Sequence, residues 1–195
     1  VTGPFLKGDE MIKTLGKSLS PEIFSEYAEH LPDRYLSSYS STEIAHHIEM
    51  AHSIEKELLL VEWEIEKEIR AKVTVCTKDR YGLFSKITGS MFLNRLNILE
   101  AQIHTWGNGI ALDIFWVEDA TKDVERRLQQ FKKDLGEILG GKVSLKDPLA
   151  KRKESNGIKQ KVIPKVLGDV KINNQDSDFY TIVEVIGDDL LGILY

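Results

Sequence analysis

The chain has 195 residues, a length that suits one large domain or two small ones, and its 42% hydrophobic and 29% charged residues exclude a wholly disordered, collagen-like or disulfide-scaffold protein. Its net charge of -5 argues against a nucleic-acid partner, because phosphate contacts normally require a basic surplus. The apolar runs are far shorter than the ~20 residues of a membrane span, no signal-peptide pattern is seen, and Cys76 is the single cysteine, so we expect a cytoplasmic protein without a membrane partner.

Residues 1–60 are predicted to be helical. The Ser-Pro pair at 20–21 is typical of a helix start, because serine caps the first turn and proline suits the first helical position, and Pro32 is expected to end this helix. Ser40 and Glu43 have the spacing of a capping box at the start of another helix. The apolar residues that follow fall near a 3.6-residue period: Ile44, Ile48, Ala51 and Leu58.

From Val61 to Ile69 apolar residues alternate with glutamates, which predicts a strand with one solvated face. The Asn-Gly pair at 108–109 predicts a tight hairpin, because both residues tolerate positive φ at the turn centres. A helix from about Lys122 should end at the two glycines at 140–141. The other expected elements are strands at 71–77, 97–105, 110–118 and 142–145, a turn at 78–82, a helix at 83–96, and an apolar stripe on the last helix at Val124, Leu128, Phe131, Leu135 and Ile138.

The order of elements over residues 71–146 is therefore β-α-β-β-α-β, which predicts a ferredoxin-like antiparallel sheet with both helices on one face. Such a unit would be more stable if its sheet edge or open face paired with another copy, so pairing between units is expected. Residues 147–168 have the composition of a linker. Their basic run is most simply a solvated connector, with an acidic partner as the alternative.

The turn that follows the strand at 71–77 recurs near the C-terminus. Asp79-Arg80-Tyr81-Gly82 is matched by Asp189-Leu190-Leu191-Gly192 after a strand predicted at 180–185, which indicates an internal repeat. The second copy stops within its first helical turn, so we expect a fragment of a longer protein. The predicted organisation is an α+β chain: a helical segment at 1–60 that is the tail of an upstream region, a first unit with a preceding strand at 61–146, a linker at 147–168, and the truncated start of a second unit at 169–195.

The chain resembles the ACT domain, a ligand-sensing ferredoxin-like module. The resemblance lies in the order of a strand, the turn at 79–84, a helix, Asn97-Ile98 and a Gly-Asn-Gly hairpin. From about residue 24 to the end, the chain resembles the C-terminal portion of the PII-protein uridylyltransferase/uridylyl-removing enzyme family. The segments that carry this wider resemblance are 31–36, 44–47, 97–105, 111–115 and 181–185.

The resemblance implies a parent protein with a nucleotidyltransferase domain, an HD phosphohydrolase domain and two C-terminal ACT domains. That family attaches UMP from UTP to the nitrogen-signalling PII protein and removes it again, and glutamine sensed at the ACT domains favours removal. The chain departs from the family's usual Asp-Arg-Pro-Gly turn. Tyr81 stands in the proline position of the first turn, and Leu190 and Leu191 replace arginine and proline in the second.

The catalytic motifs of that family are absent from this sequence. A nucleotidyltransferase needs a Gly-Ser turn followed by paired aspartates for magnesium, and the HD reaction needs an adjacent His-Asp pair; neither occurs. We therefore expect no catalytic residue, metal or cofactor in this chain, with magnesium held in the missing catalytic domains. Two Glu-x-x-His spacings, at 43–46 and 49–52, are known from di-metal bundles, but a polar helix face is the simpler interpretation.

The glycine-bearing turn is the candidate ligand site. At Gly82 backbone N–H groups can approach a ligand, and the following helix N-terminus favours a carboxylate. Asp79 could take an amino group and Asn97 either end, so the cradle suits an α-amino acid. The alternative is that Gly82 only permits the turn and Asp79 caps the helix. The predicted ligand-binding residues are Asp79, Arg80, Gly82 and Asn97, with Asp189 and Gly192 in the second unit.

Other singled-out residues are assigned to packing: Cys76, His104, Trp63, Trp106 and Trp116. Asp113 lies inside an apolar strand and is expected either on a solvated face or paired. The favoured function is the glutamine-sensing regulatory end of the uridylyltransferase, which acts on PII through the parent enzyme. The alternative is a non-enzymatic amino-acid-binding or dimerising ACT module of another protein. An RNA-binding sheet is disfavoured, because the strand at 71–77 has no aromatic residue for base stacking.

Overall fold

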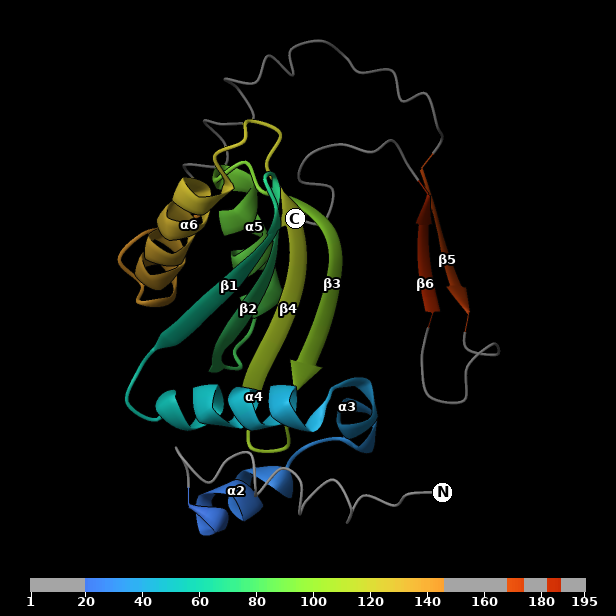
Figure 1. The fold of residues 1–195 in the computed structure, drawn as a ribbon. Helices are drawn as coiled ribbons and strands as arrows, with labels where there is room; N and C mark the ends of the chain where they lie inside the picture. Colours follow the sequence, from blue (N-terminus) through green and yellow to red (C-terminus); the bar gives the residue numbers. More distant parts are fainter. Residues whose placement is uncertain (1–19, 146–167, 174–181, 187–195) are drawn as a thin grey trace.

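Residues 20–145, 168–173 and 182–186 are described in the computed structural model of the chain. Most of them form an α+β arrangement, in which a four-stranded antiparallel sheet has helices on both faces (Figure 1). No helix within these ranges is long and apolar enough to cross a membrane. The elements are α2 (Pro21–Ala28), α3 (Asp33–Ser38), α4 (Ser41–Ser53), β1 (Leu59–Lys67), β2 (Arg70–Lys78), α5 (Leu83–Leu93), β3 (Asn97–Thr105), β4 (Ile110–Glu118), α6 (Val124–Leu139), β5 (Asp169–Asn173) and β6 (Ile182–Ile186).

The strand order of the large sheet is β1-β2-β4-β3, and β2, α5, β3, β4 and α6 follow one another as predicted. The predicted last strand at 142–145 is wrong. A turn at Gly140 and Gly141 ends α6, with the N–H of Gly141 donating to Ile138 and that of Lys142 to Glu137, and residues 142–145 then bend without pairing in the sheet. The edge of β2 is instead occupied by β1, which reaches it through a tight connection between Lys67 and Arg70. Such a local hairpin closes at little entropic cost.

The hairpin between β3 and β4 lies where the Asn-Gly signal placed it, but its geometry differs. Within this hairpin only Gly109 has positive φ, at 77°, so the expectation of positive φ at both turn centres is wrong. The N–H of Gly109 donates to Trp106, whose own N–H donates to Ile110. This is the geometry of a longer hairpin loop with one left-handed glycine, in which a single glycine supplies the required φ.

Helices α5 and α6 pack on one face of the sheet. The predicted stripe of α6 is buried throughout, and α5 adds Leu83, Ile87 and Met91. They meet alternate residues of the central strands, including Val75 and Phe115, because side chains along a strand point to opposite faces. Each fully buried large apolar side chain contributes about 1.5–3 kcal/mol, so this stripe fixes the position of α6.

The helical segment α2–α4 covers the opposite face of the same sheet (Figure 1). Ile44, Ile48 and Ala51 of α4 are fully buried and share a core with Cys76 and Leu112 of the central strands. Sequence reasoning favoured an upstream domain over packing on the sheet, because the segment has too little apolar surface to fold alone. The structure shows that its described part, from Ser20 onward, packs on the sheet. Its assignment to an upstream catalytic region stays a prediction.

The start signals of these helices are confirmed. Ser20 caps α2 ahead of Pro21, and Ser40 and Glu43 form the complete capping box of α4. Helix α2 ends at Ala28, and Pro32 precedes the first residue of α3. Helix α2 therefore ends before Pro32 is reached, and Pro32 marks only the start of α3.

The predicted strand at 180–185 is present as β6, which pairs antiparallel with β5. Strand β5 lies within the predicted second unit but was not itself predicted. Strands β5 and β6 pair antiparallel, as β1 and β2 do. That they begin a second unit stays a prediction. Asp189 and Gly192 lie outside the described residues.

Candidate functional site

The glycine-bearing turn connects the end of β2 to α5. Gly82 has φ of 71° and directly precedes α5, and a side chain there would meet nothing within 4 Å. Glycine is therefore favoured by its backbone conformation rather than by a close neighbour. The turn is fixed by backbone bonds: Asp79 N–H donates to Gly109 at 2.8 Å, and Leu83 N–H donates to Arg80 at 3.0 Å.

The side chains of this turn have different roles. Arg80 Nη1 donates to the carbonyl of Leu139 at 3.1 Å, so the guanidinium ties the turn to the C-terminal end of α6, where a cation is favourable. The Asp79 carboxylate has no hydrogen-bond partner among the described residues, and α5 receives no side-chain cap bond at Gly82. Asp79 therefore does not cap α5, and the Asp79 carboxylate faces solvent.

Asn97 is at the other end of the sheet. It begins β3 opposite Glu118, which in turn pairs with Arg70 at the start of β2, whereas Asp79 follows Lys78 at the end of β2. Eight strand positions separate the two ends, or about 26 Å. The structure does not bring Asn97 and Asp79 together, so within this unit they do not line one cradle. A site that uses both residues needs a second unit.

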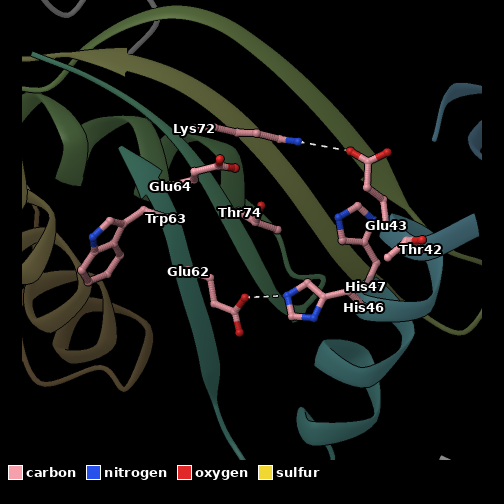
Figure 2. Close-up of a pocket in the computed structure, with 9 residues that line it drawn as sticks. All are labelled: Thr42, Glu43, His46, His47, Glu62, Trp63, Glu64, Lys72 and Thr74. Atoms are coloured by element: carbon pink, nitrogen blue, oxygen red, sulfur yellow. Dashed lines mark hydrogen bonds and ion pairs between the residues drawn. The ribbon is translucent and has the colours of Figure 1, made fainter. Parts of the chain in front are cut away.

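A cavity of about 360 Å³ lies elsewhere, between α4 and the β1–β2 hairpin (Figure 2). We call it the α4 cavity. Helix α4 supplies one wall through its first two turns, and residues of β1 and β2 supply the other. Its lining residues are Thr42, Glu43, His46, His47, Glu62, Trp63, Glu64, Lys72 and Thr74.

Two polar bridges cross this cavity from α4 to the sheet. Glu62 of β1 and His46 of α4 approach to 2.6 Å between Oε2 and Nε2, and Lys72 Nζ of β2 is 3.4 Å from Glu43 Oε1 (Figure 2). The capping bonds of Ser40 and the Lys72 ammonium together hold the pKa of Glu43 below its usual value, although burial opposes them. Glu43 thus fixes the start of α4 and its position on the sheet.

The deep wall of the cavity includes a buried histidine. His47 is 4% exposed, and its Nδ1 is hydrogen-bonded to the hydroxyl of Tyr35. Burial lowers the pKa of His47 to about 4 and raises that of Tyr35 above its usual range. Both groups are therefore neutral at pH 7, and the Tyr35 hydroxyl donates to Nδ1. The pair is a structural contact between α3 and α4, not a proton donor to the cavity.

The Glu-x-x-His spacings of α4 serve contacts along and across the helix. His46 Nδ1 lies 3.7 Å from Glu49, and His52 Nδ1 lies 3.6 Å from Glu55. No group of three or more histidine, cysteine or acidic side chains is arranged to hold a metal ion within the described ranges. The two histidines thus contact nearby glutamates of the same segment.

The aromatic and histidine residues assigned to packing do pack. Trp106 is buried in the core under α2–α4, and Trp63 points away from the α4 cavity (Figure 2) to donate to Glu125 of α6 at 3.0 Å. His104 is hydrogen-bonded to Tyr39. Cys76 is fully buried, and burial raises the pKa of its thiol to about 12, so it is not a nucleophile.

Asp113 is the buried carboxyl that sequence reasoning left open. It is 2% exposed on β4, and one oxygen accepts a long bond of 3.4 Å from the N–H of His104. Burial raises its pKa to about 7. No local pattern predicts the α4 cavity, because its residues come from α4, β1 and β2, which pack together only in the folded chain. The alternation of glutamates along β1 predicts only that one face of the strand is solvated.

The fold and this site define an α+β domain with a cavity of about 360 Å³ between α4 and the sheet. No protein-family model matches the chain. Among curated proteins, it is similar to bifunctional uridylyltransferase/uridylyl-removing enzymes. The identity is 32% over 85% of the chain for the Rhodospirillum rubrum enzyme, 33% over 64% for that of Azospirillum brasilense, and 37% over 64% for that of Rhodopseudomonas palustris. The chain spans only 18%, 14% and 14% of these relatives.

Proposed function

We propose that the chain is a regulatory part of a bifunctional enzyme that attaches UMP to the PII protein and removes it, and that it senses an amino acid, glutamine. The similarity over 85% of the chain to only 18% of a curated uridylyltransferase/uridylyl-removing enzyme is the observation that carries this proposal. The transfer and removal reactions, with their magnesium, belong to regions of the parent enzyme outside this chain.

The fold supports the sensing part of the proposal. The succession of β2, α5, β3, β4 and α6 is the one expected for an ACT unit, with β1 in place of the last strand, and a second antiparallel pair, β5–β6, lies in the segment where a second copy is predicted. In such a sensor, glutamine acts by binding one arrangement of the units more tightly than another. The turn residues Asp79, Arg80, Gly82 and Asn97 stay predicted contacts. Since Arg80 is bound to Leu139 and Asn97 lies far away, Asp79 and the backbone at Gly82 would supply this unit's share.

Glutamine titration of the complete parent enzyme tests the proposal. We expect glutamine to shift the ratio of PII uridylylation to deuridylylation toward removal, and we expect an enzyme that ends before this segment to lose the response while keeping both reactions. A parent enzyme without nucleotidyltransferase and HD motifs upstream would contradict the proposal and favour the non-enzymatic ACT module instead. Glutamine sensitivity that survives removal of the segment would also contradict it.

A further inference from the structure

The loop between β3 and β4, at residues 106–109, is bonded to two segments that are far apart in the sequence. Gly109 of this 106–109 loop accepts a 2.8 Å hydrogen bond from the N–H of Asp79, in the glycine-bearing turn. Gly107 donates a 2.9 Å hydrogen bond to the carbonyl of His30, in the connection between α2 and α3. Figure 1 shows this loop beside α2, at the end of the sheet that α4 crosses. The loop therefore joins the turn to the helical segment through backbone contacts on both sides.

The 106–109 loop is also held firmly in its own shape. The N–H of Trp106 donates to Ile110 at 2.8 Å, and the N–H of Gly109 donates to Trp106 at 2.9 Å. The Trp106 side chain is buried in the core under α2–α4, and its ring meets that of Tyr35 of α3 edge to face, with centroids 5.5 Å apart. A loop with paired backbone groups and a close-packed anchor moves as a unit rather than deforming internally.

The contact between the loop and the helical segment is close. A Cβ atom added at Gly107 would lie 3.4 Å from His30 Nδ1 and 3.6 Å from the His30 carbonyl oxygen. The φ of Gly107 is not positive, so its backbone conformation does not call for glycine. Gly82 is the opposite case, with positive φ and nothing within 4 Å of an added Cβ. Glycine at 107 is thus explained by the near approach of His30, which leaves little space for a larger side chain.

We propose that the 106–109 loop couples the turn at 79–82 to the connection between α2 and α3. A ligand that displaces the Asp79 backbone displaces Gly109, and the loop transmits this movement through Gly107 to His30. This inference rests on the proposed function, because it takes the turn as the sensing site, and it deepens that function by naming the route of regulation. Coupling between two sites is reciprocal, so disturbing the His30 contact must also loosen the turn.

Amide hydrogen exchange in the full chain tests this reciprocal effect. Gly107→Val places a branched side chain against His30, so the amide of Asp79 should exchange about tenfold faster or more, while that of Val73 in the buried part of β2 keeps its rate. Gly136→Val is the matched control, because the same change occurs where nothing lies within 4 Å of an added Cβ, and it should leave Asp79 unchanged.

Two results of the exchange experiment would overturn the coupling. The first is an unchanged rate at Asp79 in folded Gly107→Val. The second is equal acceleration at Asp79 and Val73, which would mean that the loop contributes only to global stability. If valine prevents folding, Gly107→Ala gives the same comparison with a smaller expected acceleration at Asp79, because its methyl group fits at van der Waals distance.

The complete parent enzyme tests the regulatory consequence. Gly107→Val should keep both PII uridylylation and deuridylylation, but the glutamine-dependent shift toward removal should weaken about tenfold. Gly136→Val should respond as the wild type does. A Gly107→Val enzyme that responds like the wild type contradicts the role of the loop and leaves the proposed function standing. A wild-type enzyme that does not respond to glutamine contradicts the proposed function, and with it the regulatory role of the loop.

Discussion

Burial shifts the pKa values of two ionisable residues of this fold in opposite directions. Asp113 faces the α5–α6 side of β4 and His47 lies under α3 on the other side of the sheet, and each is nearly inaccessible to water. Burial disfavours the charged form of both groups, so the carboxyl pKa rises and the imidazole pKa falls. Neither carboxyl nor imidazole belongs to the α4 cavity's charge pairs, so both effects appear in stability rather than in binding.

Asp113→Asn should stabilise the chain at neutral and alkaline pH. The folded pKa of Asp113 is about 7 against 3.8 for the ordinary carboxyl, so the unfolded chain releases this proton first and stability falls as pH rises from about 4 to about 7. The full cost is on the order of 4 kcal/mol. Asparagine has no charge to bury. Urea unfolding should show a gain of about 2–4 kcal/mol at about pH 8 that disappears at about pH 4; an equal gain at both pH values would contradict the assigned cause.

His47 should destabilise the fold on acidification. Its folded pKa is about 4 against 6.5 for the ordinary imidazole, so the unfolded chain takes up a proton first as pH falls below about 6.5. Stability should fall by on the order of 3 kcal/mol between about pH 6.5 and about pH 4 through this residue. Substitution His47→Gln removes the titrating group. The difference in unfolding free energy between wild type and variant, followed over this range, should shrink toward acid pH; a constant difference would show that His47 does not titrate there.

At the scale of elements, the local signals were reliable where a few adjacent residues decide the outcome. The Ser20-Pro21 start, the Ser40–Glu43 capping box and the apolar stripe of α6 were all confirmed, because caps and amphipathic periods act within one element. The strand at 142–145 was wrong, because occupation of a sheet edge depends on which strand reaches it first through the shortest connection. The spacing of apolar residues does not show which of two candidate strands will pair with β2.

Gly82 gives a prediction at this scale. Its left-handed φ of 71° means that Gly82→Ala should destabilise the fold by about 1–2 kcal/mol, although the added methyl meets no neighbour. Gly136 in α6 is the matched control, because a methyl there also meets nothing within 4 Å but the backbone is helical. Gly136→Ala should stabilise by about 0.5–1 kcal/mol. Thermal unfolding of both variants should move the midpoints in opposite directions; two shifts of the same sign would show that the conformation of Gly82 is not decisive.

At the scale of the whole molecule, the α+β class and the order of elements could be predicted, but the relation between the helical segment and the sheet could not. Each strand residue alternates between two faces, and Cys76, Leu112 and Ile114 are apolar on the face opposite α5 and α6. That second apolar face was the available signal for another layer, since an antiparallel sheet with one solvated face would have polar residues there. The candidate site was missed for the same reason, because the α4 cavity exists only once α4 lies across β1 and β2.

The two cores share one sheet, so we expect α2–α4 and the α5–α6 layer to unfold together. Ile48→Ala in α4 and Leu128→Ala in α6 each remove a fully buried side chain from one core and should each cost about 2–5 kcal/mol. The single cysteine reports the opening, because Cys76 is buried between the helical layer and the sheet. Under conditions where reclosing is fast, both variants should speed the modification of Cys76 by a thiol reagent in proportion to their loss of global stability.

If Ile48→Ala exposes Cys76 while urea unfolding of the sheet is unchanged, the helical layer is a separate unit, as its assignment to an upstream domain implies. Because the helical segment and the α5–α6 layer pack on the same sheet, we expect the first result, in which residues from Ser20 onward fold together with the sheet.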